Sequence, residues 1–155
     1  IRRQRQMCIR DRYDAFLTKQ DPAFTVEELE EAMQKVMDQY AGGIGTHYQF
    51  NEKQLAMAEE KIKKLQILAK GLAAADMHEL MFIYELKERL TVCLTVIAHL
   101  RARKETRWHS FAENLDYPEK SDAWLCYVNS KKNGDQITMI RRDLVKGGET
   151  YEHRD

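Results

Sequence analysis

The strongest constraint on the fold is the long, largely apolar segment from Met77 to Lys104. Asp76 precedes it as a helix N-cap, and Glu79 stands at the third helical position, which completes the pattern of a capping box. Apolar side chains then recur at alternating spacings of three and four residues, on one helical face: Ile83, Leu86, Leu90, Cys93, Ile97 and Leu100. Between Leu90 and Leu100 the other faces are apolar too. A helix that is apolar all round is buried on several sides, so we expect it to need more covering surface than two neighbouring helices supply.

Two shorter helices are predicted upstream of this segment. Thr25 and Glu28 form the pattern of a capping box before a helix over 26–40. Asn51 caps a second helix over 52–69, with Gln54 at its third position. Each helix carries one apolar face at heptad spacing: Val26, Leu29, Met33, Val36 and Tyr40 in the first, and Leu55, Ala58, Ile62, Leu65, Ala69 and Leu72 in the second. Because the connections are short, successive helices should lie antiparallel.

The C-terminal part has a different pattern. The β-prone segments 124–128 and 136–140 flank Asn133-Gly134, and this dipeptide is a strong hairpin signal. The expected fold is therefore mainly α: an antiparallel three-helix bundle, similar to a spectrin repeat, followed by a loop and a short C-terminal β-hairpin. Gly42, Gly43 and Gly45 superficially match a phosphate-binding loop, but no strand precedes them. We interpret them as a helix stop and a tight turn.

Composition excludes several classes of protein. The 155 residues fit one domain, and the formal net charge of zero gives no global attraction to nucleic acid or acidic lipid. The longest apolar run, Leu90–Leu100, is shorter than the roughly 20 residues that span a bilayer. The three cysteines are isolated, which is typical of reduced thiols in a cytosolic protein. The five histidines do not have the spacing of a metal site, and His99 is expected to be a hydrogen-bonded core residue.

The first twelve residues look foreign to the rest of the chain. They contain five arginines and one acid, without an apolar period or an initiator Met. The string from Arg5 to Arg12 resembles translated sequencing-adapter read-through at the end of a truncated gene. We expect residues 1–12 to be non-native. The alternative is a basic arm that binds phosphate, which would make the chain a nucleic-acid binder.

Residues 101–118 are the most informative stretch for function. The long helix ends in a basic cluster, and a loop then runs to Asp116-Tyr117-Pro118. The cations either complement the helix macrodipole or contact an anionic group elsewhere. Aromatic side chains gather from here onward, either as a small satellite core or as a docking face for another subunit: Trp108, Phe111, Tyr117, Trp124 and Tyr127.

Several segments together resemble the C-terminal region of flavoprotein subunits of the fumarate reductase, succinate dehydrogenase and adenylylsulfate reductase superfamily. They are 25–29, 33–37, 40–44, 76–81 and the string Ala102-Arg103-Lys104-Glu105-Thr106-Arg107 with its following Asp-Tyr-Pro. The resemblance covers roughly residues 24–130. Thr106-Arg107 is followed by Trp108-His109-Ser110-Phe111, where fumarate reductases have Gly and a nearby His. This form is more similar to the adenylylsulfate reductase branch.

The resemblance implies a C-terminal helical scaffold domain of an FAD-dependent oxidoreductase subunit, which packs on a flavin domain and docks an iron–sulfur subunit. It divides the chain into a linker (13–24), the bundle (25–106), and the loop, hairpin and tail (107–155). FAD would belong to the parent protein, and this chain would bind none and be inactive alone. The substrate, adenylylsulfate or fumarate/succinate, stays open. The expected location is cytoplasmic, with peripheral attachment to the inner membrane through partner subunits as an option.

No catalytic, cofactor-binding or metal residue is assigned, because the superfamily's glycine-rich FAD motif and its substrate-handling His and Arg have no counterpart here. Seven residues are candidate contacts to the flavin domain or another subunit: Arg103, Arg107, Trp108, His109, Asp116, Tyr117 and Trp124. A different class of function is also open, because the same heptad faces suit a free-standing helical module for protein interaction.

Overall fold

The computed structural model describes residues 10–11, 13–19, 21–134 and 136–145. The hypothesis about residues 1–12 therefore lies almost wholly outside the described residues, as do Cys8 and the tail from 146 onward. Residues 13–17, expected as part of a linker, are helical, and Phe16 is buried.

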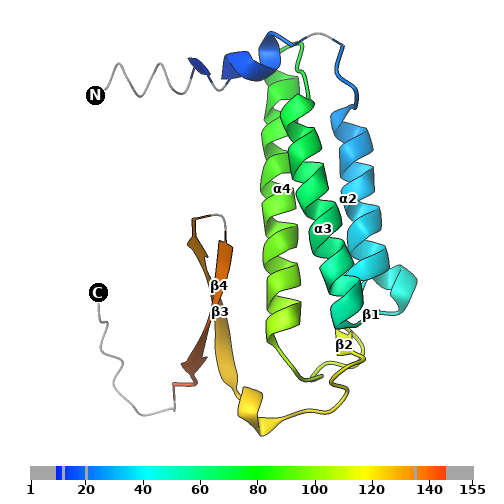
Figure 1. The fold of residues 1–155 in the computed structure, drawn as a ribbon, viewed down its shortest axis with the longest axis vertical. Helices are drawn as coiled ribbons and strands as arrows, with labels where there is room; N and C mark the ends of the chain where they lie inside the picture. The colour runs from blue at the N-terminus through cyan, green and yellow to red at the C-terminus, as the bar shows by residue number, and fades with distance from the viewer. Residues whose placement is uncertain (1–9, 12, 20, 135, 146–155) are drawn as a thin grey trace.

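Three long helices form the body of the protein: α2 (Val26–Tyr40), α3 (Glu52–Leu68) and α4 (Met77–Ala102). They begin at the predicted residues. Helix α3 ends one residue early and continues as the 3₁₀ turn η2 (Ala69–Gly71), and α4 ends two residues before the predicted Lys104. Figure 1 shows the three helices side by side, with successive helices running in opposite directions.

The predicted caps are confirmed, with two corrections to the capping boxes. Thr25 and Glu28 form the complete box. Asn51 accepts from the backbone N of Gln54 at 2.8 Å, but the side chain of Gln54 does not return the bond: its Oε1 is buried without a hydrogen-bond partner. Asp76 accepts from the first turn of α4, whereas the carboxylate of Glu79 reaches one residue further back, to the N–H of Ala75 at 2.7 Å.

The core lies between the three helices, where the heptad faces meet. The face of α3 is buried as predicted, and so are the central positions of the other two helices: Leu29, Met33, Leu55, Ala58, Ile62, Leu65, Ala69, Leu72, Ile83, Leu86, Leu90 and Ile97. Burial of each leucine, isoleucine or methionine side chain in this set contributes about 1.5–3 kcal/mol. Helix α4 is less completely covered than its sequence suggests, because Val92 and Val96 are 60% and 40% exposed. No helix in the described residues is long and apolar enough to cross a membrane.

A two-stranded parallel pairing joins the loop between α2 and α3 to the loop that follows α4. Strand β1 (Gln49–Phe50) pairs with β2 (Glu113–Asn114), 64 residues later. Leu115 N donates to Phe50 O at 2.8 Å, and Glu113 N donates to Tyr48 O at 2.9 Å. The sequence pattern did not predict these short strands. They hold the loop that follows α4 against the start of α3.

The predicted hairpin is present and longer than expected. After the 3₁₀ turn η3 (Asp122–Trp124), β3 (Cys126–Asn133) pairs antiparallel with β4 (Gln136–Asp143). Gly134 has a φ of +59° at the turn, a conformation that favours glycine. The hairpin stands alongside α4 (Figure 1).

The glycine-rich segment is the helix stop that was predicted. Gly42 has a φ of +76°, and Gly45 N donates to the carboxylate of Asp38 at 2.9 Å. The 3₁₀ turn η1 (Ile44–Thr46) follows. The backbone N–H of Gly45 is therefore occupied by this protein's own carboxylate.

Candidate functional site

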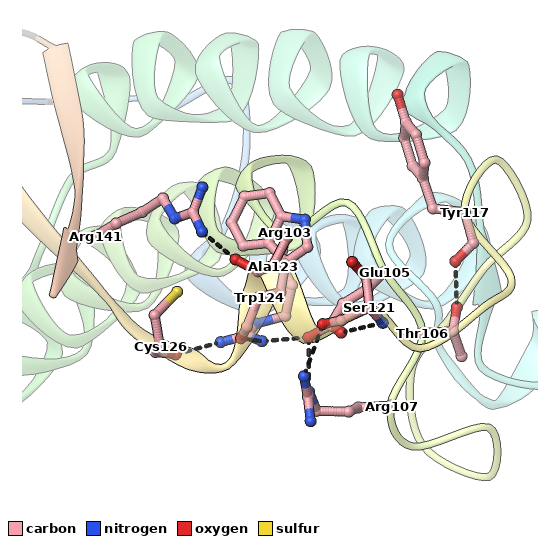
Figure 2. Close-up of polar contacts among 10 residues, drawn as sticks. All are labelled: Arg103, Glu105, Thr106, Arg107, Tyr117, Ser121, Ala123, Trp124, Cys126 and Arg141. Atoms are coloured by element: carbon pink, nitrogen blue, oxygen red, sulfur yellow. Dashed lines mark hydrogen bonds and ion pairs between the residues drawn. The ribbon is translucent and has the colours of Figure 1, made fainter. Parts of the chain in front are cut away.

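Glu105 is the centre of a polar cluster immediately after α4 (Figure 2). Its side chain is fully buried. Oε1 accepts from Arg103 Nη1 at 2.5 Å and from Arg107 Nε at 2.7 Å, and Oε2 accepts from Ser121 N at 3.0 Å. A buried carboxylate is costly unless it is paired and hydrogen-bonded, and here both of its oxygens have partners.

The two arginines connect this carboxylate to the segment that leads into the hairpin. Arg103 donates to Trp124 O and to Cys126 O, both at 3.0 Å, and Arg107 donates to Ser121 O at 3.0 Å. The end of α4 is thereby fastened to η3 and to the start of β3. The basic cluster therefore serves a structural purpose in this chain beyond complementing the helix dipole.

The Trp124 ring is in contact with two guanidinium groups. The Arg141 guanidinium is 4.4 Å from the ring centroid and that of Arg103 is 6.0 Å away, distances typical of cation–π contacts. Arg141 also donates to the carbonyl of Ala123 (Figure 2). These contacts attach β4 to η3, which Arg103 and Arg107 in turn fasten to the end of the helix.

The electrostatics of the cluster follow from these contacts. Burial alone raises the pKa of the Glu105 carboxyl, but the hydrogen bonds from Arg107, from Ser121 N and from Arg103 outweigh it, so the pKa lies below its ordinary value. The hydrogen bond to Glu105 raises the pKa of Arg107. Glu105 is therefore ionised at neutral pH and bound by two cations.

A second buried group closes the loop. Thr106 is fully buried, and its hydroxyl accepts from Asn114 N and donates to Tyr117 O, both at 2.9 Å. Its backbone N donates to Glu119 O at 3.2 Å. The Glu105-Thr106 pair thus organises the loop from both sides, and sequence reasoning missed both residues. The available signal was a single acid placed between Arg103 and Arg107.

Asp116 and Tyr117, predicted as contacts to another domain, have partners within this chain. The carboxylate of Asp116 accepts from Glu52 N at 2.7 Å, at the first turn of α3. The Tyr117 ring lies 5.8 Å from Lys104 Nζ. Their role as external contacts stays a prediction.

Trp108 and His109 make no hydrogen bond to this cluster, and both side chains are exposed. The Trp108 side chain is exposed, as is that of Phe111, and His109 Nδ1 is 3.5 Å from Glu113 Oε1. Tyr117 and Tyr127 are exposed as well. The interpretation of the aromatic residues as a satellite core is therefore wrong, because only Trp124 of that set is half-buried.

A groove of about 570 Å³ lies between α4, the loop and the hairpin. Its walls include Val92 and Val96 from α4, Val128 from β3, and Trp108 from the loop, with the Glu105 cluster at one end. His99 lines the same groove half-buried, and its imidazole has no hydrogen-bond partner among the described residues, so it is not the bonded core histidine that was expected. The groove combines apolar walls with a polar end, a composition suited to covering by protein.

The described residues offer little for catalysis. They contain no group of three or more His, Cys, Asp or Glu side chains that could hold a metal ion. Cys93 and Cys126 are free thiols, and burial raises the pKa of Cys93, which disfavours the reactive thiolate. The ionised groups of the Glu105 cluster pair with one another. This arrangement fixes the conformation of the loop.

The described chain is a helical core to which an internal Arg–Glu–Arg cluster fastens a loop and a hairpin. The family described as "Fumarate reductase flavoprotein C-term" matches residues 30–149. The chain belongs to this family and is a C-terminal domain of the adenylylsulfate and fumarate reductase type of flavoprotein.

Individual relatives agree with the resemblance seen in the sequence. The alpha subunit of adenylylsulfate reductase from Megalodesulfovibrio gigas is 34% identical over 98 residues, 63% of this chain and 15% of that protein. The solved adenylylsulfate reductase of Archaeoglobus fulgidus is 35% identical with a TM-score of 0.78, over 86% of this chain and 21% of its own. An E. coli quinol fumarate reductase shares the fold alone, at 18% identity and a TM-score of 0.76, over 97% of this chain and 26% of its own.

This chain spans between 15% and 26% of the length of these relatives. The activity, substrates and partners of a whole protein of this kind therefore enter only as proposals.

Proposed function

We propose that this chain is the scaffold portion of an FAD-dependent oxidoreductase subunit of the adenylylsulfate reductase or fumarate reductase type, and that it contributes no catalytic residue. The observation that carries the proposal is the family match over residues 30–149, together with the partly uncovered apolar face of α4. The Glu105 cluster supports it, because its charged groups are used internally to fix the loop and hairpin. A scaffold of this kind presents surfaces and leaves the chemistry to the rest of the parent protein.

The flavin domain of the parent covers the groove and the exposed face of α4. Val92 and Val96 are exposed apolar side chains one helical turn apart, and Trp108 continues the apolar surface across the groove. Contiguous apolar surface of this kind is typical of an interaction site. Arg103 and Arg107 position the loop at the end of the groove. The polar edge of this loop faces the flavin domain.

FAD belongs to the flavin domain, and this chain alone binds none and is inactive. The substrate of the parent is adenylylsulfate, which the sequence identity to two adenylylsulfate reductases favours. The alternative substrates are fumarate and succinate. The parent works in the cytoplasm or at the inner membrane through partner subunits. An iron–sulfur subunit docks on the hairpin-bearing side, where Trp124 and the loop aromatics lie.

A free-standing interaction module is the second candidate. The observation that favours it is the closed core of α2, α3 and α4, whose buried side chains are covered by this chain itself. Such a module would behave as an antiparallel three-helix bundle of the spectrin-repeat kind. It differs from the first proposal in needing no flavin domain for its function.

The two candidates are distinguished by co-expressing this chain with the flavin-binding portion of its parent as a separate polypeptide. We expect the two to co-purify, and Val92→Asp with Val96→Asp to weaken their association at least tenfold. Ile44→Asp is the control, because Ile44 is 75% exposed in the turn after α2 and does not line the groove. Failure of the two polypeptides to associate, or saturable binding of FAD by this chain alone, would contradict the scaffold proposal.

A further inference from the structure

Asn133 differs from the other asparagines of this chain in the residue that follows it. The sequence contains four asparagines, and Asn133 is the one that precedes a glycine. Because glycine has no Cβ, its backbone nitrogen can approach the side-chain amide of the residue before it. The other three asparagines precede larger residues, whose side chains crowd that approach. Asn133 is therefore the asparagine most open to attack by its own main chain.

The structure leaves the Asn133–Gly134 pair unprotected. Both residues are exposed, and the Asn133 side chain makes no hydrogen bond to another described residue. Gly134 N lies outside the β3–β4 register and donates to no described carbonyl, and no atom lies within 4 Å of the position that a Cβ would take there. The side chains of Asn51 and Asn114, by contrast, each accept a hydrogen bond from a backbone N–H.

The tip of the hairpin can open without disturbing the helical core. On β3 the last half-buried side chain before the turn is Val128, and residues 129–133 are all exposed. A two-stranded hairpin is only marginally stable by itself, so the terminal pair of Asn133 with Gln136 opens more readily than the pairs near α4. Opening lets Asn133 rotate out of the extended conformation, which holds its side-chain amide away from Gly134 N.

From these observations we propose that Asn133 is a site of spontaneous deamidation, and that the isoaspartyl product opens the tip of the hairpin. Gly134 N attacks Cγ of Asn133, the new N–Cγ bond closes a cyclic imide, and the Cγ–Nδ2 bond breaks. The proton of the Gly134 amide leaves with the side-chain nitrogen as ammonia. Water then opens the imide at either of its carbonyls. The net reaction consumes one water molecule and releases one ammonia molecule, without a change of oxidation state.

Opening of the imide at the former backbone carbonyl gives the isoaspartyl residue. The main chain then passes through Cβ and Cγ of residue 133, so it is one methylene longer, and the former backbone carbonyl becomes a carboxylate. Loop length fixes the turn type and the register of a hairpin, so the added atom disrupts the pairing of Asn133 with Gln136. The inference is independent of the proposed function, because it involves only water and atoms of this chain.

The test incubates the full chain in its folded state in mildly alkaline buffer and maps its peptides by mass spectrometry. We expect Asn133 to convert at least tenfold faster than Asn129, which lies on the same strand and precedes Ser130. In water enriched in oxygen-18 the product should gain one heavy oxygen. Methylation by an isoaspartyl-specific carboxyl methyltransferase distinguishes isoaspartate from aspartate. Asn133→Gln should not convert, because its longer side chain would have to close a larger ring.

Hydrogen exchange measures the structural consequence. Amides at both ends of the turn, within residues 130–133 and 136–138, should exchange faster in the incubated chain than in the fresh chain. Incubation should not change their exchange in Asn133→Gln. Fresh Asn133→Asp adds the negative charge without the extra methylene, so its amides should stay as protected as those of the unmodified chain.

Three results would overturn the proposal. Asn133 that converts no faster than Asn129 in the folded chain is not a deamidation site. Conversion confined to the chain unfolded in urea would mean that the hairpin protects the residue. If Asn133 converts and exchange at the turn is unchanged, or is equally fast in fresh Asn133→Asp, the lengthened main chain does not open the tip.

Discussion

The carboxylate of Asp116 accepts a hydrogen bond from the backbone N–H of Glu52 at 2.7 Å, although the two residues are 64 positions apart. The contact satisfies an orphan donor at the first turn of α3 and places a negative charge at the positive end of the helix. It also joins the loop after α4 to the start of α3, next to the β1–β2 pairing. Two loops that are far apart in the sequence are thus connected at one helix terminus.

This contact predicts a measurable cost of mutation. Asp116→Ala should lower the free energy of unfolding by about 1 kcal/mol, because a helix-capping interaction and its dipole contribution are lost. Urea denaturation of this chain measures the change. Glu119→Ala is the control, because that exposed side chain has no hydrogen bond in the described structure and only its carbonyl is used. Equal stability of the two variants would mean that Asp116 is not a cap.

Glu105 is expected to be the most important polar side chain of the loop. Glu105→Gln removes the negative charge that Arg103 and Arg107 share, and hydrogen bonds to charged groups contribute about 1.5–3 kcal/mol. We expect a loss of about 2 kcal/mol, with faster hydrogen exchange at residues 121–126. Glu88→Gln on the exposed side of α4 should change neither quantity. Unchanged exchange in the Glu105 variant would show that the cluster does not fasten the hairpin.

The same residue predicts a pH dependence. The folded protein holds the pKa of Glu105 below its ordinary value, so the unfolded state binds more protons in mildly acidic solution. The stabilisation from Glu105 is therefore complete above the unfolded pKa of roughly 4.3 and is lost as the pH falls through the lower, folded pKa. Thermal unfolding of the unmodified chain and of Glu105→Gln should differ at pH 7 and converge in acid. A difference that stays constant down to pH 2 would contradict this linkage.

The same change at two nearby positions of α4 should have very different effects on stability. Leu90 is completely buried, so Leu90→Asp places an unpaired charge in the core and should cost several kcal/mol, enough to unfold the domain. Val92, two residues later, is 60% exposed, and Val92→Asp should leave the melting temperature nearly unchanged. Scanning calorimetry of both variants makes the comparison. If Leu90→Asp melts like the unmodified chain, α4 is not the centre of the core.

Much of the helical architecture was predictable because its signals are short-range. Thr25, Asn51 and Asp76 cap the helices at the predicted residues, since a cap acts within one helical turn. The heptad faces predicted the buried residues of α3 completely, because period alone decides which side chains share a face. The hairpin followed from Asn133-Gly134 for the same local reason, although its strands extend further than the apolar pattern.

The candidate site was less predictable. Arg103 and Arg107 were recognised as unusual, but their partner Glu105 was not, because a charged residue between two arginines has the same local sequence whether it is buried or exposed. His99 was expected in a core that does not enclose it, and of the two interpretations of the loop aromatics, the satellite core is wrong because most of these side chains are exposed. The exposed face of α4 could only be located once the neighbouring helices were in place.

The amino-acid sequence by itself determined where the helices and the hairpin form, which faces they bury, and the family to which the chain belongs. Periodicity, capping and turn chemistry are properties of residues within a few positions of one another, so they can be read along the chain. The tertiary structure decided that Glu105 is shared by two arginines, that Asp116 caps a helix 64 residues away, and that Val92 and Val96 stay uncovered. These relationships depend on which distant segments come into contact. The free energy of such contacts depends on the packing of the whole fold, so it cannot be read from neighbouring residues.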